Sequence, residues 1–128
     1  MGLIMRVATV THELQQPIRH VNQMASGGSY YAVFTLRLTP VHNVPAVTFS
    51  CEATAPDLES WIAAAVESGV REFVSARERD GRPVGCLHVS LIDILIHPAD
   101  LKELAFMRAA AMAMAQAFEA HETLVDVA

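Results

Sequence analysis

The stretch LIDILIHPADLKELAF, residues 91–106, places a histidine and an aspartate three residues apart in a short connection between two regular elements. The imidazole of His97 and the carboxylate of Asp100 could bind a metal ion, exchange a proton or contact a nucleic acid. Asp100 is also followed by Glu103 at the spacing of a helix capping box, which involves no chemistry. We favour capping for Asp100. For His97, an RNA or partner contact, simple surface exposure and a metal ligand all stay open.

Elsewhere the sequence offers no pattern that we can defend as catalytic or metal-binding. Its six histidines have no HxxxH spacing on a helix, and neither Cys51 nor Cys86 belongs to a CxxC pair, so we expect two buried free thiols. The P-loop pattern GxxxxGK[ST] is absent, and no Ser-His-Asp or paired-carboxylate spacing stands out. Apart from the open role of His97, near which an enzyme pocket is the least favoured alternative, the sequence therefore predicts a protein that is not an enzyme and holds no metal, cofactor or nucleotide.

The charges argue against a general nucleic-acid surface, because the chain has nine basic and fourteen acidic residues and a formal charge of -5. Its one concentration of arginines comprises Arg71, Arg77, Arg79 and Arg82. Interspersed acidic residues neutralise most of it, so we predict a solvated loop over 76–83 and no phosphate clamp.

Length and composition indicate one domain, 1–128, with a core of its own. Hydrophobic residues make up 52% of the chain, which is rich for a small monomer, so we expect apolar surface to be covered in a homodimer. No apolar run approaches the roughly 20 residues that a membrane-spanning helix needs, and the N-terminal MGLIMRVATV shows no cleavage pattern. We therefore expect a cytoplasmic protein without a membrane partner.

The periodicity of apolar residues predicts an α+β fold. Alternation and turn residues predict strands over 4–11, 18–25, 29–40, 46–54 and 84–96, with a turn at Pro17 and helices from Pro56 to about 74 and over 100–122. The last strand is almost continuously apolar, which indicates an interior position in the sheet. We predict a two-layer sandwich of a mainly four-stranded sheet with two helices on one face.

Four successive motifs between residues 65 and 110 suggest a family: a helix ending AVxxG[IV], a loop ending GYPV, a strand VxVxLxD and the segment GxYHxVDSSExAFKxAA. The matching residues are Ala65, Val66, Gly69 and Val70; Gly81, Pro83 and Val84; Leu87, Val89, Leu91 and Asp93; and His97, Asp100, Glu103, Ala105, Phe106, Ala109 and Ala110. In these residues the chain resembles the fourth domain of elongation factor G, the GTPase that drives translocation on the ribosome. The segment ASGGSYYAVFTLRLTP, 25–40, is similar to a glycine-rich turn and strand of the same domain.

The resemblance implies a sandwich with a left-handed β-α-β crossover, against the usual rule for such connections. It also implies that two loops at the tip of the domain contact ribosomal RNA and the codon–anticodon helix. The expected tip residues are Ser26, Gly27, Gly28 and Ser29 in one loop, and Ile96, His97, Pro98 and Asp100 in the other. We expect a free-standing, non-enzymatic relative that binds the ribosome or structured RNA through these loops.

An alternative follows from the three residues before His97, where the family has Gly-Ser-Tyr and this chain has Ile94, Leu95 and Ile96. An apolar tip is suited to a protein partner or a second copy of the chain. The alternative is therefore a repurposed interaction module that docks through this tip.

Overall fold

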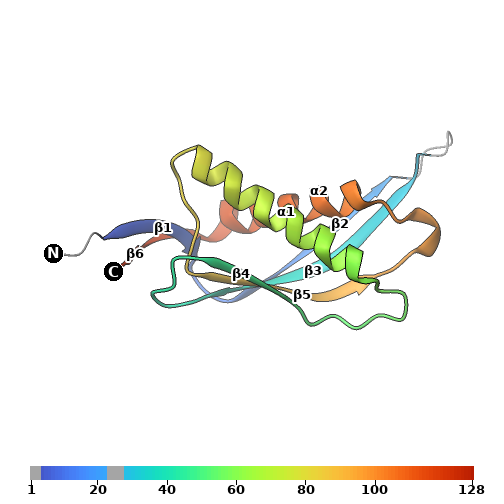
Figure 1. The fold of residues 1–128 in the computed structure, drawn as a ribbon, viewed down its shortest axis with the longest axis horizontal. Helices are drawn as coiled ribbons and strands as arrows, with labels where there is room; N and C mark the ends of the chain where they lie inside the picture. Colours follow the sequence, from blue (N-terminus) through green and yellow to red (C-terminus); the bar gives the residue numbers. More distant parts are fainter. Residues whose placement is uncertain (1–3, 23–27) are drawn as a thin grey trace.

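The computed structural model describes residues 4–22 and 28–128 and shows an α+β fold, as predicted (Figure 1). The elements are β1 (Met5–Val10), β2 (Leu14–Asn22), β3 (Tyr30–Pro40), β4 (Val47–Cys51), α1 (Ser60–Arg79), β5 (Leu87–Leu95), the 3-10 turn η1 (Pro98–Asp100), α2 (Glu103–His121) and β6 (Glu122–Val127). Four strands form a mixed sheet in the order β2-β3-β5-β4, in which only β4 and β5 run parallel. Both helices lie on one face of this sheet (Figure 1), as expected of two layers.

The core lies between the sheet and the helices, and strand alternation determines which side chains enter it. On β3, Phe34, Leu36 and Leu38 are buried and the residues between them are only partly covered, which confirms the predicted alternation. β5 lies between β3 and β4, which confirms its interior position. An irregularity in the β3–β5 pairing, opposite Ile92, shifts the alternation, so Ile94 faces the core instead of solvent.

Small residues let the two helices pack closely. The face of α2 toward the core is built from alanines between Phe106 and Phe118, and both rings are almost fully buried. On α1, Gly69 lies so close to α2 that a Cβ atom added there would be 2.1 Å from the carbonyl oxygen of Met107. Glycine at this position therefore sets the distance between the helices.

Two predicted strand assignments were wrong. The second strand begins at Leu14 instead of residue 18 and includes Pro17, which we had placed in a turn. Since β2 is an edge strand, the proline can sit in it without removing a hydrogen bond of an interior strand. The predicted last helix extends to 122 with no strand after it, whereas α2 ends at His121 and β6 follows at once and pairs antiparallel with β1.

Helix α1 differs from its prediction at both ends. It begins at Ser60, and Pro56 and Asp57 form the turn before it. At its C-terminal end it continues through the first half of the predicted loop 76–83, where Arg77 is buried instead of solvated.

Buried Arg77 is held by aromatic rings and an ion pair. Its guanidinium lies 5.7 Å from the ring centre of Phe73 and 5.5 Å from that of Phe118. It donates two hydrogen bonds, of 2.9 and 3.0 Å, to the carboxylate of Glu122 at the start of β6. This side chain therefore ties α1 to α2 and to the β1–β6 pair.

The two thiols also differ from expectation, because Cys86 is buried as predicted but Cys51, at the end of β4, is exposed. Among the helices of the described residues, none combines the length and apolarity that crossing a bilayer requires.

Candidate functional site at the tip

The two loops singled out by the sequence are anchored at the same end of the molecule, because the end of β2, the start of β3 and the end of β5 all lie opposite the β1–β6 pair (Figure 1). One connects β2 to β3, and the other connects β5 to α2 through η1. Of the first loop, Ser26 and Gly27 lie outside the described residues, and Gly28 and Ser29 immediately precede β3. We call Ser29, Tyr31, His97 and Asp100, which meet here, the tip array.

Asp100 joins the two loops. Its Oδ1 accepts a hydrogen bond of 2.5 Å from the hydroxyl of Ser29, and its Oδ2 lies 2.7 Å from Nδ1 of His97. The carboxylate side chain is only 16% exposed, so both bonds are shielded from competing water. Asp100 therefore fixes the position of one loop against the other and the orientation of the imidazole.

The predicted capping role of Asp100 was wrong. Lys102 is the N-cap residue of α2, and no side chain makes a capping bond there. Asp100 ends the turn η1, which Pro98 begins, and Leu101 and Lys102 separate it from the helix. Its carboxylate turns back toward Ser29 and His97.

His97 presents its free edge to solvent. Its side chain is 53% exposed, and because Nδ1 is engaged by Asp100, Nε2 is left for an external group. Nε2 donates a hydrogen bond when the ring is protonated and accepts one when it is neutral. Ser29 donates to the carboxylate and not to the imidazole, so these residues do not form a nucleophile and its base. The arrangement is suited to binding.

The aromatic residues of the tip are a feature that the sequence did not lead us to expect. The ring of Tyr31 lies 5.4 Å from that of His97, and on the neighbouring strand His20 lies 4.6 Å from the ring of Tyr30. Burial first, and then the positive charge of Arg108, lower the pKa of His20 below its ordinary value. The two adjacent tyrosines at the start of a strand were the available signal, and strand alternation places Tyr30 against the core and Tyr31 beside His97.

The apolar tip of the alternative hypothesis is mostly internal. Ile94 belongs to the core, and Ile96 is partly buried and packs against it. Only Leu95, with 56% of its surface exposed, faces outward. The irregularity in β5 explains why Ile94 is not at the surface, because simple strand alternation would point its side chain outward and the irregularity turns it inward.

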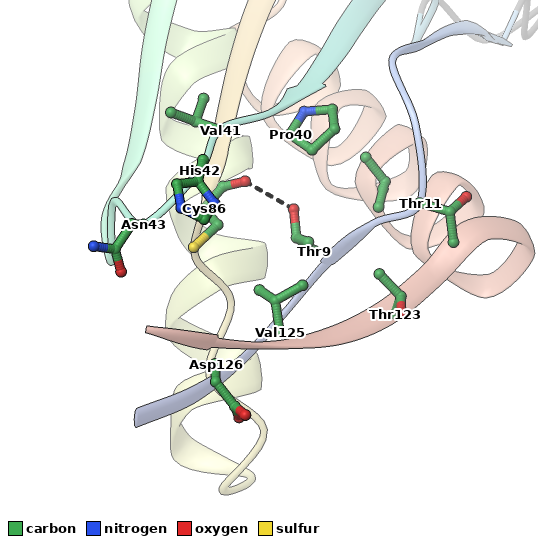
Figure 2. A pocket seen from close by; sticks show the side chains of 11 residues that line it. Thr9, Thr11, Pro40, Val41, His42, Asn43, Cys86, Thr123, Val125 and Asp126 are labelled. Atoms are coloured by element: carbon green, nitrogen blue, oxygen red, sulfur yellow. Dashed lines mark hydrogen bonds between the residues drawn. The ribbon is translucent and has the colours of Figure 1, made fainter. Parts of the chain in front are cut away.

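A second candidate, which the sequence did not indicate, is a hollow of about 320 Å³ at the opposite end of the molecule. It lies between the β1–β6 pair and the end of β3, and Cys86, His42 and Thr123 are among its lining residues (Figure 2). Its wall is fixed by Thr9, whose hydroxyl donates a 2.9 Å hydrogen bond to the carbonyl oxygen of Cys86. Cys86 has φ 50, a left-handed conformation that is strained for a cysteine.

Neither location offers a closed metal site. Within residues 4–22 and 28–128, no three side chains of the types His, Cys, Asp and Glu converge to hold an ion.

No protein-family model matches the chain. Its fold is similar to that of a protein from Thermus thermophilus, ttk003000868, whose crystal structure aligns over 96% of this chain with a TM-score of 0.77 and 24% sequence identity. The aligned part is 18% of that protein, so this chain spans less than a fifth of its length. At this level of identity, the likeness concerns the fold alone.

Proposed function

We propose that this chain is a non-enzymatic domain akin to the fourth domain of elongation factor G and that its tip binds the ribosome or structured RNA. The observation that carries the proposal is the tip array, in which Asp100 links both loops and holds His97 with its outer nitrogen free. We also propose that the β4–α1–β5 connection has the left-handed course that the resemblance implies.

The chemistry of the tip supports RNA over a protein partner. An imidazole edge, a serine hydroxyl and the ring of Tyr31 are groups that contact ribose, phosphate and base faces. A protein-docking tip needs a continuous apolar surface, and here two of the three aliphatic residues before His97 face inward. With a chain charge of -5, binding depends on these local contacts more than on general attraction to phosphate, so its salt dependence is shallow.

Co-sedimentation of the purified chain with ribosomes tests the proposal. We expect association at low salt and a loss of about tenfold in affinity for His97→Ala, the usual size for one hydrogen bond to a charged group. Asp100→Asn should weaken binding comparably, because Ser29 and His97 contact different carboxylate oxygens and the amide nitrogen that replaces one of them cannot accept a hydrogen bond. His42→Ala, which alters an exposed histidine at the opposite end, is the matched control.

Absence of association at low salt would overturn the proposal. Association that Leu95→Ser abolishes and His97→Ala leaves intact would instead favour the interaction module, with Leu95 as its anchor. Sedimentation-velocity analysis of the chain alone, as a separate measurement, shows whether it forms a dimer.

A further inference from the structure

Two histidines that are far apart in sequence lie together where the β1–β6 pair meets the rest of the molecule. His12 follows β1 and His121 ends α2, and the centres of their rings are 5.0 Å apart with an angle of 80° between the planes. Neither belongs to the tip, and the two are separated by more than 100 residues, so spacing along the chain could not reveal the pair.

The backbone holds the two residues in place before any ligand arrives. The β1–β6 pairing ends with Val10 opposite Glu122. At the next residue of the chain, the amide of Thr11 donates a 2.9 Å hydrogen bond to the carbonyl oxygen of His121. The hydroxyl of Thr11 lies 2.8 Å from Nδ1 of His12. In the tautomer with its proton on Nδ1, His12 donates to this hydroxyl and keeps Nε2 free as a metal ligand. Histidines that bind metals usually donate their second ring N–H to a neighbouring group in this way.

The separation of the rings is compatible with one shared ion. Zinc binds imidazole nitrogen at about 2.0–2.1 Å, so two imidazoles on one ion at angles near 90–110° have ring centres about 4.5–5.3 Å apart. The observed 5.0 Å lies inside this range. Edge-to-face packing of two rings produces similar distances, so the experiment has to separate the two explanations.

We propose that His12 and His121 form a two-point binding site for Zn²⁺, with water in the remaining coordination positions. Two neutral imidazoles favour a borderline ion such as zinc over magnesium or calcium, which prefer oxygen ligands. The adjacent carboxylates are already engaged, Glu122 by Arg77 and Glu13 by the hydroxyl of Thr39. The bound ion would fasten the β1–β2 connection to the end of α2.

Calorimetric titration of the tag-free chain with Zn²⁺ alone tests this site. We expect saturable binding of one ion per chain, a rise in melting temperature of about 3 °C or more at saturation, and no response to Mg²⁺. His12→Ala and His121→Ala should each weaken binding at least about tenfold, whereas His42→Ala should leave it unchanged. Acidification should also weaken it, because protons compete for the ring nitrogens.

A spectroscopic readout distinguishes coordination from packing. With Cu²⁺ as the probe, electron paramagnetic resonance should show coupling to two imidazole nitrogens in the native chain and to one in His12→Ala, a variant that alters an exposed residue. Absence of saturable Zn²⁺ binding, or binding that His12→Ala leaves unchanged, would overturn the proposal. Neither result depends on whether the tip binds RNA.

Discussion

The surroundings of His20, on β2 near the tip, shift its titration. By strand alternation it shares the inner side of β2 with buried Ile18, and its ring rests on that of Tyr30. Burial removes water from the charged imidazole, and Arg108 on α2 adds repulsion, so the pKa of His20 lies below the ordinary 6.5. The folded protein therefore favours the neutral ring.

This shift predicts how stability depends on pH. As pH falls from 6.5 toward the folded-state pKa of His20, the unfolded chain takes up its proton first, so this histidine makes the folded state less stable across that window. Chemical denaturation of the native chain and of His20→Gln at several pH values should show that the substitution removes part of this loss. A pH dependence identical in the two proteins would contradict the prediction.

Nuclear magnetic resonance separates the two causes of the shift. Replacing Arg108 by Gln should move the titration of His20 upward but leave it below 6.5, because burial is the larger cause. Arg82→Gln, a change of another exposed arginine in the loop that follows α1, is the control for the loss of one positive charge.

At the scale of elements, α1 and α2 approach each other closely where they cross at Gly69. An added Cβ atom would lie 2.1 Å from the carbonyl oxygen of Met107 and 2.7 Å from the Cβ of Ala110, and backbone cannot yield as a flexible side chain does. Gly69→Ala should therefore push the helices apart and lower the free energy of unfolding by about 1–3 kcal/mol, despite the better helix propensity of alanine.

The matched control is Ser68→Ala on the exposed side of the same helix, which should change the free energy of unfolding by less than about 0.5 kcal/mol. Urea denaturation measures both variants. Equal stability of the two would mean that the crossing tolerates a methyl group and that the glycine has another role.

Elements with local signals were predictable, and those that depend on distant partners were not. The alternation within β3 predicted a strand with one buried face, and the apolar run of β5 predicted a strand in the interior of the sheet. Both predictions were possible because burial on one face selects alternating apolar residues and burial on two faces selects consecutive ones. β6 was missed because its five residues after Glu122 gain a partner only when β1 comes alongside. Burial of Arg77 likewise requires Phe118 and Glu122, which tertiary packing brings to it.

The tip shows the same division. Ser29, His97 and Asp100 were identified from the sequence by position in a motif, and the structure brings them within hydrogen-bonding distance. The role of Asp100 was mistaken because its spacing to Glu103 fits a capping box, and local spacing cannot reveal that Ser29 competes for the same carboxylate across the tip.

At the scale of the whole molecule, the question is whether the β1–β6 pair and the four-stranded sheet unfold as one unit. Cys86 lies between them: Val7, Cys86 and Val127 form a small core of their own, and the amide and carbonyl of Cys86 bond to the turn that precedes β4. Its thiol can react only when this junction opens, whereas that of Cys51 is exposed.

Thiol alkylation therefore reports on the junction. In the native chain we expect fast alkylation of Cys51 and slow alkylation of Cys86, and in Cys51→Ser only the slow reaction. If the junction opens only with global unfolding at about 5 kcal/mol, the alkylation of Cys86 is slowed by about three to four orders of magnitude.

Thr9→Val, which removes the hydrogen bond to the Cys86 carbonyl, should speed the alkylation of Cys86 about two- to tenfold. If Cys86 becomes reactive in urea too dilute to unfold the main sheet, the β1–β6 pair opens separately, and the expectation of one cooperative domain fails.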